Sequence, residues 1–135
     1  MTEEYVGRIE GLLSRLSPLL AEKSLTVRRP SSDVLILRVD LRFADGRRFE
    51  GNEIWRPRGR KYRFQMMGEG GRLLWRLDNA PHHRGIASFP HHVHDHQGPV
   101  APSVGLDLAG VLDALPTDAA PGKAGAPRGS PANSS

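Results

Sequence analysis

Histidine is the residue type with the clearest capacity for chemistry in this sequence. The chain has 135 residues, and all six of its histidines lie between His82 and His96. Imidazole ordinarily titrates near neutral pH, so paired histidines can serve as general base and general acid. The chain contains no cysteine, which excludes thiol nucleophiles, thiolate zinc sites and disulfide frameworks. Imidazole is therefore the main candidate for proton transfer.

Three interpretations of the histidine-rich stretch remain open at this point. In the first, the imidazoles hydrogen-bond to the carbonyls of a His- and Pro-rich loop and are purely structural. In the second, His92, His94 and His96 project from one face of a strand, and two of them hold a zinc or other transition ion with a third ligand. In the third, the histidines act as acid and base at an RNA 2′-hydroxyl or leaving oxygen. Asp78 precedes the stretch and either forms an Asx turn or orients an imidazole.

Positive charge is concentrated in the middle of the chain. Lys and Arg number 19 against 15 Asp and Glu, a net charge of +4, and the excess lies between Arg28 and Arg84. Most of these cations are arginine, whose guanidinium binds phosphate oxygens in a bidentate manner. A solvated hairpin tip or an Arg-rich codon usage would give the same pattern. The candidates for nucleic-acid binding are Arg56, Arg58, Arg60, Lys61, Arg63 and Arg76.

The hydrophobic periodicity predicts an α+β fold. Apolar residues recur every three or four positions over residues 3–16, which indicates an amphipathic helix that ends at Ser17-Pro18. Alternating apolar residues then predict four strands, joined by tight turns that include Asp45-Gly46. Their ranges are 33–43, 48–57, 61–67 and 72–78. The expected architecture is an N-terminal helix packed on a four-stranded antiparallel meander.

Two irregular places accompany these strands. The alternation fails between Gly51 and Glu53, which predicts a β-bulge. Residues 25–29 are expected to form only a short extended piece.

The C-terminal third of the chain has a different character. Residues 79–102 are predicted to be a His-rich loop, and residues 106–115 a short helix. Residues 1–115 would then form a single domain. Residues 116–135 are rich in Pro, Ala, Gly and Ser and carry no large apolar side chain, so this tail is predicted to be disordered. No apolar run reaches 18 residues and the N-terminus resembles no secretory signal, so a cytoplasmic protein without membrane contact is expected.

Two short motifs flank the histidines. Residues 78–83 read DNAPHH and residues 89–94 read FPHHVH, and both follow the meander. This combination resembles the TumE family, proposed toxins of bacterial type II toxin–antitoxin modules, over residues 33–94. The resemblance implies a toxin whose free form arrests growth. It also implies a cognate antitoxin as partner, typically a small helix-turn-helix DNA-binding protein encoded alongside.

Three functions compete within this frame. The first is a metal-independent ribonuclease that needs no cofactor and binds RNA through the cations named above. Two of its histidines would act as base and acid, with Asp78 orienting one of them. The histidine candidates are His82, His83, His91, His92 and His94. The second is a metal-dependent phosphodiesterase or nucleotidyl transferase, with a transition metal at the same histidines. The third is a non-catalytic module whose His–Pro surface docks the antitoxin or another target.

Overall fold

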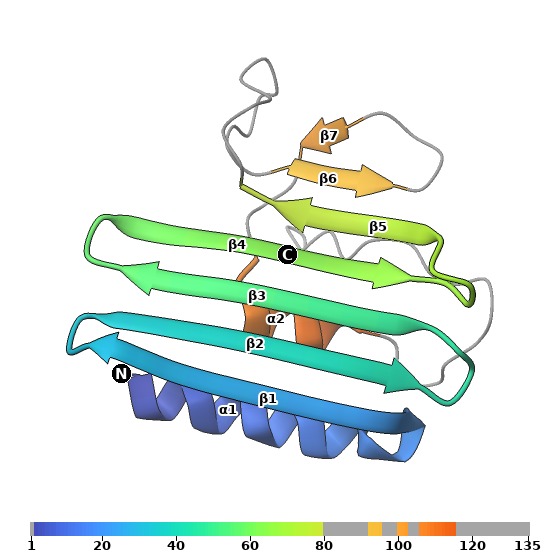
Figure 1. Ribbon diagram of the computed structural model, residues 1–135, viewed down its shortest axis with the longest axis horizontal. Coiled ribbons are helices and arrows are strands. Elements are labelled where there is room, and N and C mark those ends of the chain that lie inside the picture. The colour runs from blue at the N-terminus through green and yellow to red at the C-terminus, as the bar shows by residue number, and fades with distance from the viewer. Residues whose placement is uncertain (1, 80–91, 96–99, 103–105, 116–135) are drawn as a thin grey trace.

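The computed structural model describes residues 2–79, 92–95, 100–102 and 106–115. The described chain has one antiparallel sheet, whose strands lie in sequence order from β1 to β7, and two helices (Figure 1). The elements are α1 (Thr2–Leu16), a 3-10 turn (Ser17–Leu19), β1 (Leu20–Ser31), β2 (Val34–Phe43), β3 (Arg48–Arg56), β4 (Gly59–Met67), β5 (Leu73–Asp78), β6 (His92–Asp95), β7 (Val100–Pro102) and α2 (Leu108–Ala114).

The helix and the four strands expected from periodicity are confirmed. Helix α1 presents Val6, Ile9, Leu13 and Leu16 to the core, and its first turn carries acidic residues that favour the helix N-terminus. The chain stops being α-helical at Ser17, and Pro18 stands in the 3-10 turn that follows. In β2 every second residue from Leu35 to Phe43 is buried, as the alternation predicts. The Asp45-Gly46 turn also forms, with Gly46 at a φ of 97°.

The expected number of strands is wrong, because β1 is a full strand of 12 residues. It pairs with β2 from Leu20 to Ser31, with register shifts near each end. Nearly all of its side chains are exposed, and only Leu20, Leu25 and Val27 are half-buried. A strand at the edge of a sheet needs little apolar surface, so its sequence shows little alternation. The four strands predicted from sequence thus become five long ones, extended by two short ones.

The region predicted to be a His-rich loop is also partly wrong. Strand β6 begins at His92 and pairs with β5, and β7 pairs with β6. The remaining residues of the loop prediction, 80–91 and 96–99, lie outside the described residues. So does the tail from residue 116 onward, and its disorder stays a prediction.

The β-bulge expected at Gly51–Glu53 is absent, since β3 keeps a continuous register with both β2 and β4 there. The alternation fails for another reason: the core-facing positions of β3 hold a glycine and a glutamate. A Cβ on Gly51 would lie 2.9 Å from Cδ1 of Leu108. Glycine is therefore needed at position 51 so that α2 can approach the sheet.

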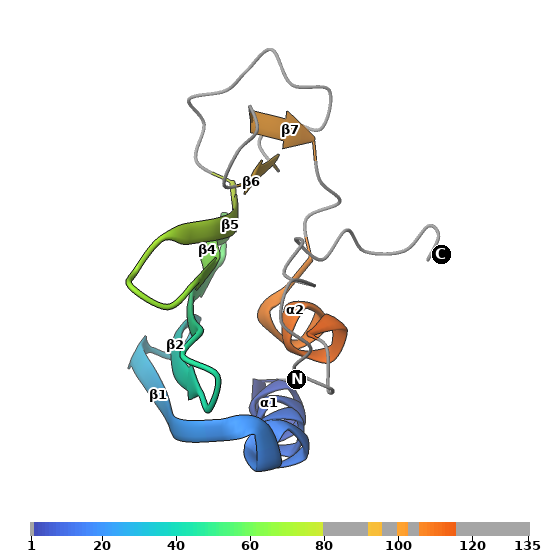
Figure 2. The same ribbon diagram turned by 90° about the vertical axis from the view of Figure 1, so that its right-hand side faces the viewer.

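The fold has two layers. Both helices pack on one face of the sheet, as Figure 2 shows, and they contact each other and β3. The buried apolar side chains between the layers form a single core cluster. Among the described residues no helix covers the opposite face, which we call the open face. Along β2, β3 and β4 its side chains alternate with those of the core and are mostly polar.

Candidate functional site

The open face has a pocket over β3, β4 and β5. Its volume is about 240 Å³. Three of its lining residues are cations, Lys61, Arg63 and Arg76, and Asp78 adds a carboxylate. The other lining residues are Asn52, Ile54 and Tyr62. Strand alternation explains this arrangement, because Lys61 and Arg63 are two residues apart, as are Arg76 and Asp78, so each pair shares one face.

Asp78 occupies a central position in this arrangement. The register places it opposite Arg63 on β4 and opposite His92 on β6. Only 5% of Asp78 is exposed. Directly opposed residues of an antiparallel pair have Cα atoms about 4.5–5.5 Å apart and lie on the same face. The sequence candidates Asp78 and His92 therefore hold paired positions on adjacent strands.

Arg76 forms the next row across the open face. It lies opposite Gln65 on β4 and opposite His94 on β6. The Nε of Arg76 donates to Oε1 of Gln65 at 3.1 Å, and Nε2 of Gln65 donates to Oε1 of Glu50 at 2.8 Å. This chain of hydrogen bonds holds the Arg76 side chain beside the pocket. Gln65 and Glu50 were not among the sequence candidates, although they face the same side of the sheet as Arg76 and Asp78.

The predicted nucleic-acid-binding cations do not all lie together. Arg56, Lys61 and Arg63 are exposed on the open face, and Arg58 is exposed in the turn between β3 and β4. Within the described residues no hydrogen bond or ion pair engages these four side chains. Arg60 lies on the opposite face of β4, with 14% of its side chain exposed. Side chains alternate between the two faces of a strand, so Arg60 faces away from Lys61 and toward the side of the buried Tyr62.

The predicted histidines are only partly described. His92 and His94 lie on β6 at the register positions given above. His82, His83 and His91 lie outside the described residues, so their place in the site stays a prediction. The same holds for a metal at the histidines.

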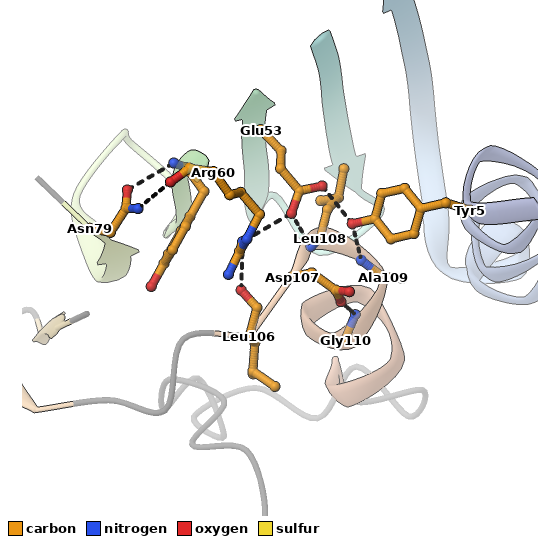
Figure 3. A network of polar contacts seen from close by, with 10 residues as sticks. Tyr5, Glu53, Arg60, Asn79, Leu106, Asp107, Leu108, Ala109 and Gly110 are labelled. Atoms are coloured by element: carbon orange, nitrogen blue, oxygen red, sulfur yellow. Dashed lines mark hydrogen bonds and ion pairs between the residues drawn. The ribbon is translucent and has the colours of Figure 1, made fainter. Parts of the chain in front are cut away.

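On the helix-covered face a polar network surrounds Glu53, a residue that the sequence showed only as a break in alternation (Figure 3). Glu53 is fully buried. Its Oε2 accepts from Nη1 of Arg60 and from the backbone N–H of Leu108, each at 3.0 Å. Its Oε1 accepts from the hydroxyl of Tyr5. One carboxylate thereby connects α1, β4 and the first turn of α2.

Burial controls the ionisation of this network. It raises the pKa of Glu53 above the ordinary value of 4.5, against the hydrogen bonds from Tyr5 and Leu108 and the charge of Arg60, which lower it. Burial and the Glu53 carboxylate also raise the pKa of Tyr5 well above its ordinary value of 10.0. The phenol therefore stays protonated and donates to Glu53.

The raised pKa of Glu53 makes stability depend on pH. Because the folded state binds this proton more tightly than the unfolded state, the free energy of unfolding should fall as pH rises from 4.5 through the folded pKa. Glu53→Gln removes the titration, so the stability of the native chain relative to this variant should be greatest at acidic pH. Urea denaturation of both proteins between pH 4 and pH 8 measures the difference. A difference that stays constant or grows with pH would contradict the assignment.

Neither helix in the described part of the chain has the length and apolar character that a membrane crossing requires. No curated protein matches the chain. No solved structure matches it either. The family model described as Toxin TumE matches residues 9–116, most of the chain, and this range includes the pocket residues, β6 and α2. The chain therefore belongs to the TumE family of toxins.

Proposed function

We propose that the protein is the toxin of a type II toxin–antitoxin module and acts as a metal-independent ribonuclease. The observation that carries the proposal is the register of β4, β5 and β6, in which Asp78 pairs with Arg63 on one side and with His92 on the other. Arg63 and Asp78 also line a pocket that contains three cations. Phosphate affinity and acid–base groups are thus combined at one place.

The chemistry of such a site follows from its groups. One histidine would remove the proton of an RNA 2′-hydroxyl, whose oxygen then attacks the adjacent phosphorus. A second histidine would donate a proton to the departing 5′-oxygen, which leaves a 2′,3′-cyclic phosphate and a free 5′-hydroxyl. Asp78 would orient the imidazole of His92, and Lys61 and Arg63 would neutralise the phosphate charge. Neither proton transfer needs a metal.

The partners follow from the same proposal. The toxin family points to a cognate antitoxin, and we take this to be a small helix-turn-helix DNA-binding protein encoded alongside. The substrate is RNA, so the site of action is the cytoplasm.

Loss of two cations should weaken RNA binding without abolishing the chemistry. We expect the native chain to cleave RNA in EDTA, and Lys61→Ala with Arg63→Ala to raise KM about tenfold at moderate salt. Because each lost phosphate contact removes released counterions, the dependence of log KM on log salt should become shallower by about one per contact. Initial rates across a salt series measure both quantities.

A variant with equal charge loss serves as the control. Arg8→Ala with Arg72→Ala removes two exposed cations, one on α1 and one in the turn between β4 and β5, and should leave the slope unchanged. Intact RNA in EDTA that is cleaved once zinc or manganese is added would favour the metal-dependent alternative. Intact RNA under both conditions, with growth arrest retained in cells, would reject ribonuclease activity.

A further inference from the structure

Arg60 contacts both ends of the chain segment that carries every histidine. Residues 80–105 contain all six histidines. This segment begins after Asn79, contributes β6 and β7 to the sheet, and ends before Leu106, which lies two residues ahead of α2. Figure 3 shows Asn79 and Leu106 on either side of Arg60. Asn79 and Leu106 are far apart in sequence, but both contact Arg60. Asn79 contacts its backbone carbonyl, and Leu106 contacts its guanidinium.

The exit is held by the Asn79 side chain. Its Nδ2 donates to the carbonyl oxygen of Arg60 at 2.6 Å, and its Oδ1 accepts from the backbone N–H of Tyr62 at 2.9 Å. The amide thus extends the pairing of β4 and β5 one step beyond Asp78. This contact fixes the direction in which the chain leaves Asp78.

The return is held by the Arg60 guanidinium. Its Nη1 donates to the carbonyl oxygen of Leu106 at 3.2 Å and to Oε2 of Glu53 at 3.0 Å. The same Glu53 oxygen accepts from the backbone N–H of Leu108, and Asp107 caps α2 by accepting from the N–H of Gly110 at 2.7 Å. Arg60 is therefore bonded directly to Leu106, just before α2, and is connected to the first turn of α2 through Glu53.

The guanidinium itself is held rigidly. It lies over the ring of Tyr62, with Cζ 4.3 Å from the ring centroid, and over Trp55 at 5.2 Å. Its ion pair with Glu53 has 14% and 0% of the two side chains exposed. A planar cation that stacks on aromatic rings while donating hydrogen bonds is a role suited to arginine more than to lysine.

We infer that Arg60 is a positioning residue that closes the histidine-bearing segment at both ends, and that it is not a phosphate ligand. Its backbone carbonyl holds Asn79, which adjoins Asp78, and its guanidinium holds Leu106. This inference rests on the proposed ribonuclease for its effect on rate, whereas its structural part stands independently. This positioning role also accounts for the contacts of the Arg60 guanidinium with Glu53, Leu106 and two aromatic rings.

Hydrogen exchange and kinetics on the full chain test the inference. Arg60→Met keeps an apolar stem against Tyr62 and Trp55 but removes the donors. We expect exchange in residues 106–115 to become at least about tenfold faster, because their contact uses the guanidinium. Strands β1 and β2 and residues 73–79 should keep their protection, because Asn79 contacts only the Arg60 backbone. On RNA, kcat should fall about 100-fold with KM within about twofold, because the reacting groups are displaced.

Two further variants and one control variant keep the test decisive if Arg60→Met fails to fold. Asn79→Ala leaves the Glu53–Arg60 pair intact and should speed exchange at residues 73–79 alone. Arg60→Lys should recover part of the lost kcat, because its ammonium retains one donor contact. Arg72→Met, an exposed arginine in the turn between β4 and β5, should change neither exchange nor kcat.

The outcomes separate the two proposals. Unchanged exchange at residues 106–115 in Arg60→Met, or equal loss of protection throughout the sheet, would overturn the inference. Faster exchange at residues 106–115 together with an unaltered kcat would overturn the positioning role. If the native chain cleaves no RNA, the proposed ribonuclease fails, and the exchange pattern alone decides whether Arg60 holds the segment.

Discussion

Glu53→Ala should lower the free energy of unfolding by about 3–5 kcal/mol, the usual cost of breaking a buried ion pair. The substitution leaves the Arg60 guanidinium, the Tyr5 hydroxyl and the Leu108 N–H without the carboxylate that accepts from all three. It also opens a cavity beneath α2, which adds to the loss. Small domains are stable by only about 5–15 kcal/mol, so the variant should be marginal. Urea denaturation at neutral pH measures the change.

The neighbouring glutamate of the same strand provides the control. Glu50 lies on the open face and accepts a hydrogen bond from Gln65, so Glu50→Ala should cost about 1 kcal/mol or less. Glu53→Gln should fall between the two, because its amide oxygen still accepts from Leu108 while the ion pair is lost. A Glu53→Ala variant as stable as Glu50→Ala would show that the network contributes little.

Asp78→Asn should reduce RNA cleavage about 100-fold or more. The amide nearly preserves the shape of the carboxylate, so the buried position at the end of β5 should still fold. It cannot stabilise a cationic imidazole as a carboxylate does, and orienting and acid–base groups of this kind contribute about 10- to 10⁴-fold in rate. Initial rates in EDTA and growth after induction of the toxin in cells measure the two consequences.

Two comparisons sharpen this result. His92→Ala should be at least as damaging, and the double variant should be no worse than the more damaging single one, because residues that act as a unit are not additive. Asp40→Asn alters an open-face aspartate that pairs with Arg38 and should leave the rate within about twofold. A folded Asp78→Asn protein with full activity would remove Asp78 from the mechanism.

Much of this fold could be predicted because its signals are local. The alternation from Leu35 to Phe43 and the Asp45-Gly46 turn depend only on the pleat and on turn geometry. The motif pair around the histidines likewise identified the family, which the match over residues 9–116 confirms. Strand β1 was not predicted as a full strand, because it has few apolar side chains that alternate. As an edge strand, it is stabilised by pairing with β2.

Sequence reasoning misjudged two residues for one shared reason. Glu53 was taken as a sign of a bulge, and Arg60 as another cation of the cluster with Lys61 and Arg63. Strand parity turns both residues toward the helices, whereas it leaves Lys61 and Arg63 on the open face. The alternation did indicate this orientation, because Arg60 is separated from the apolar Tyr62 and Phe64 by even numbers of positions and so faces the same side of the strand.

By itself, the sequence determined the α+β class, the meander, the basic character of its centre, the concentration of imidazole in one segment and the family. Only the tertiary structure decided that Asp78 stands opposite His92, and that Glu53 and Arg60 form a buried pair. The physical reason is that periodicity and turn chemistry operate over a few neighbouring residues, whereas the environment of a buried charge depends on distant ones. Leu106 accepts from Arg60, and Leu108 donates to Glu53. Each leucine is about fifty residues along the chain from its charged partner.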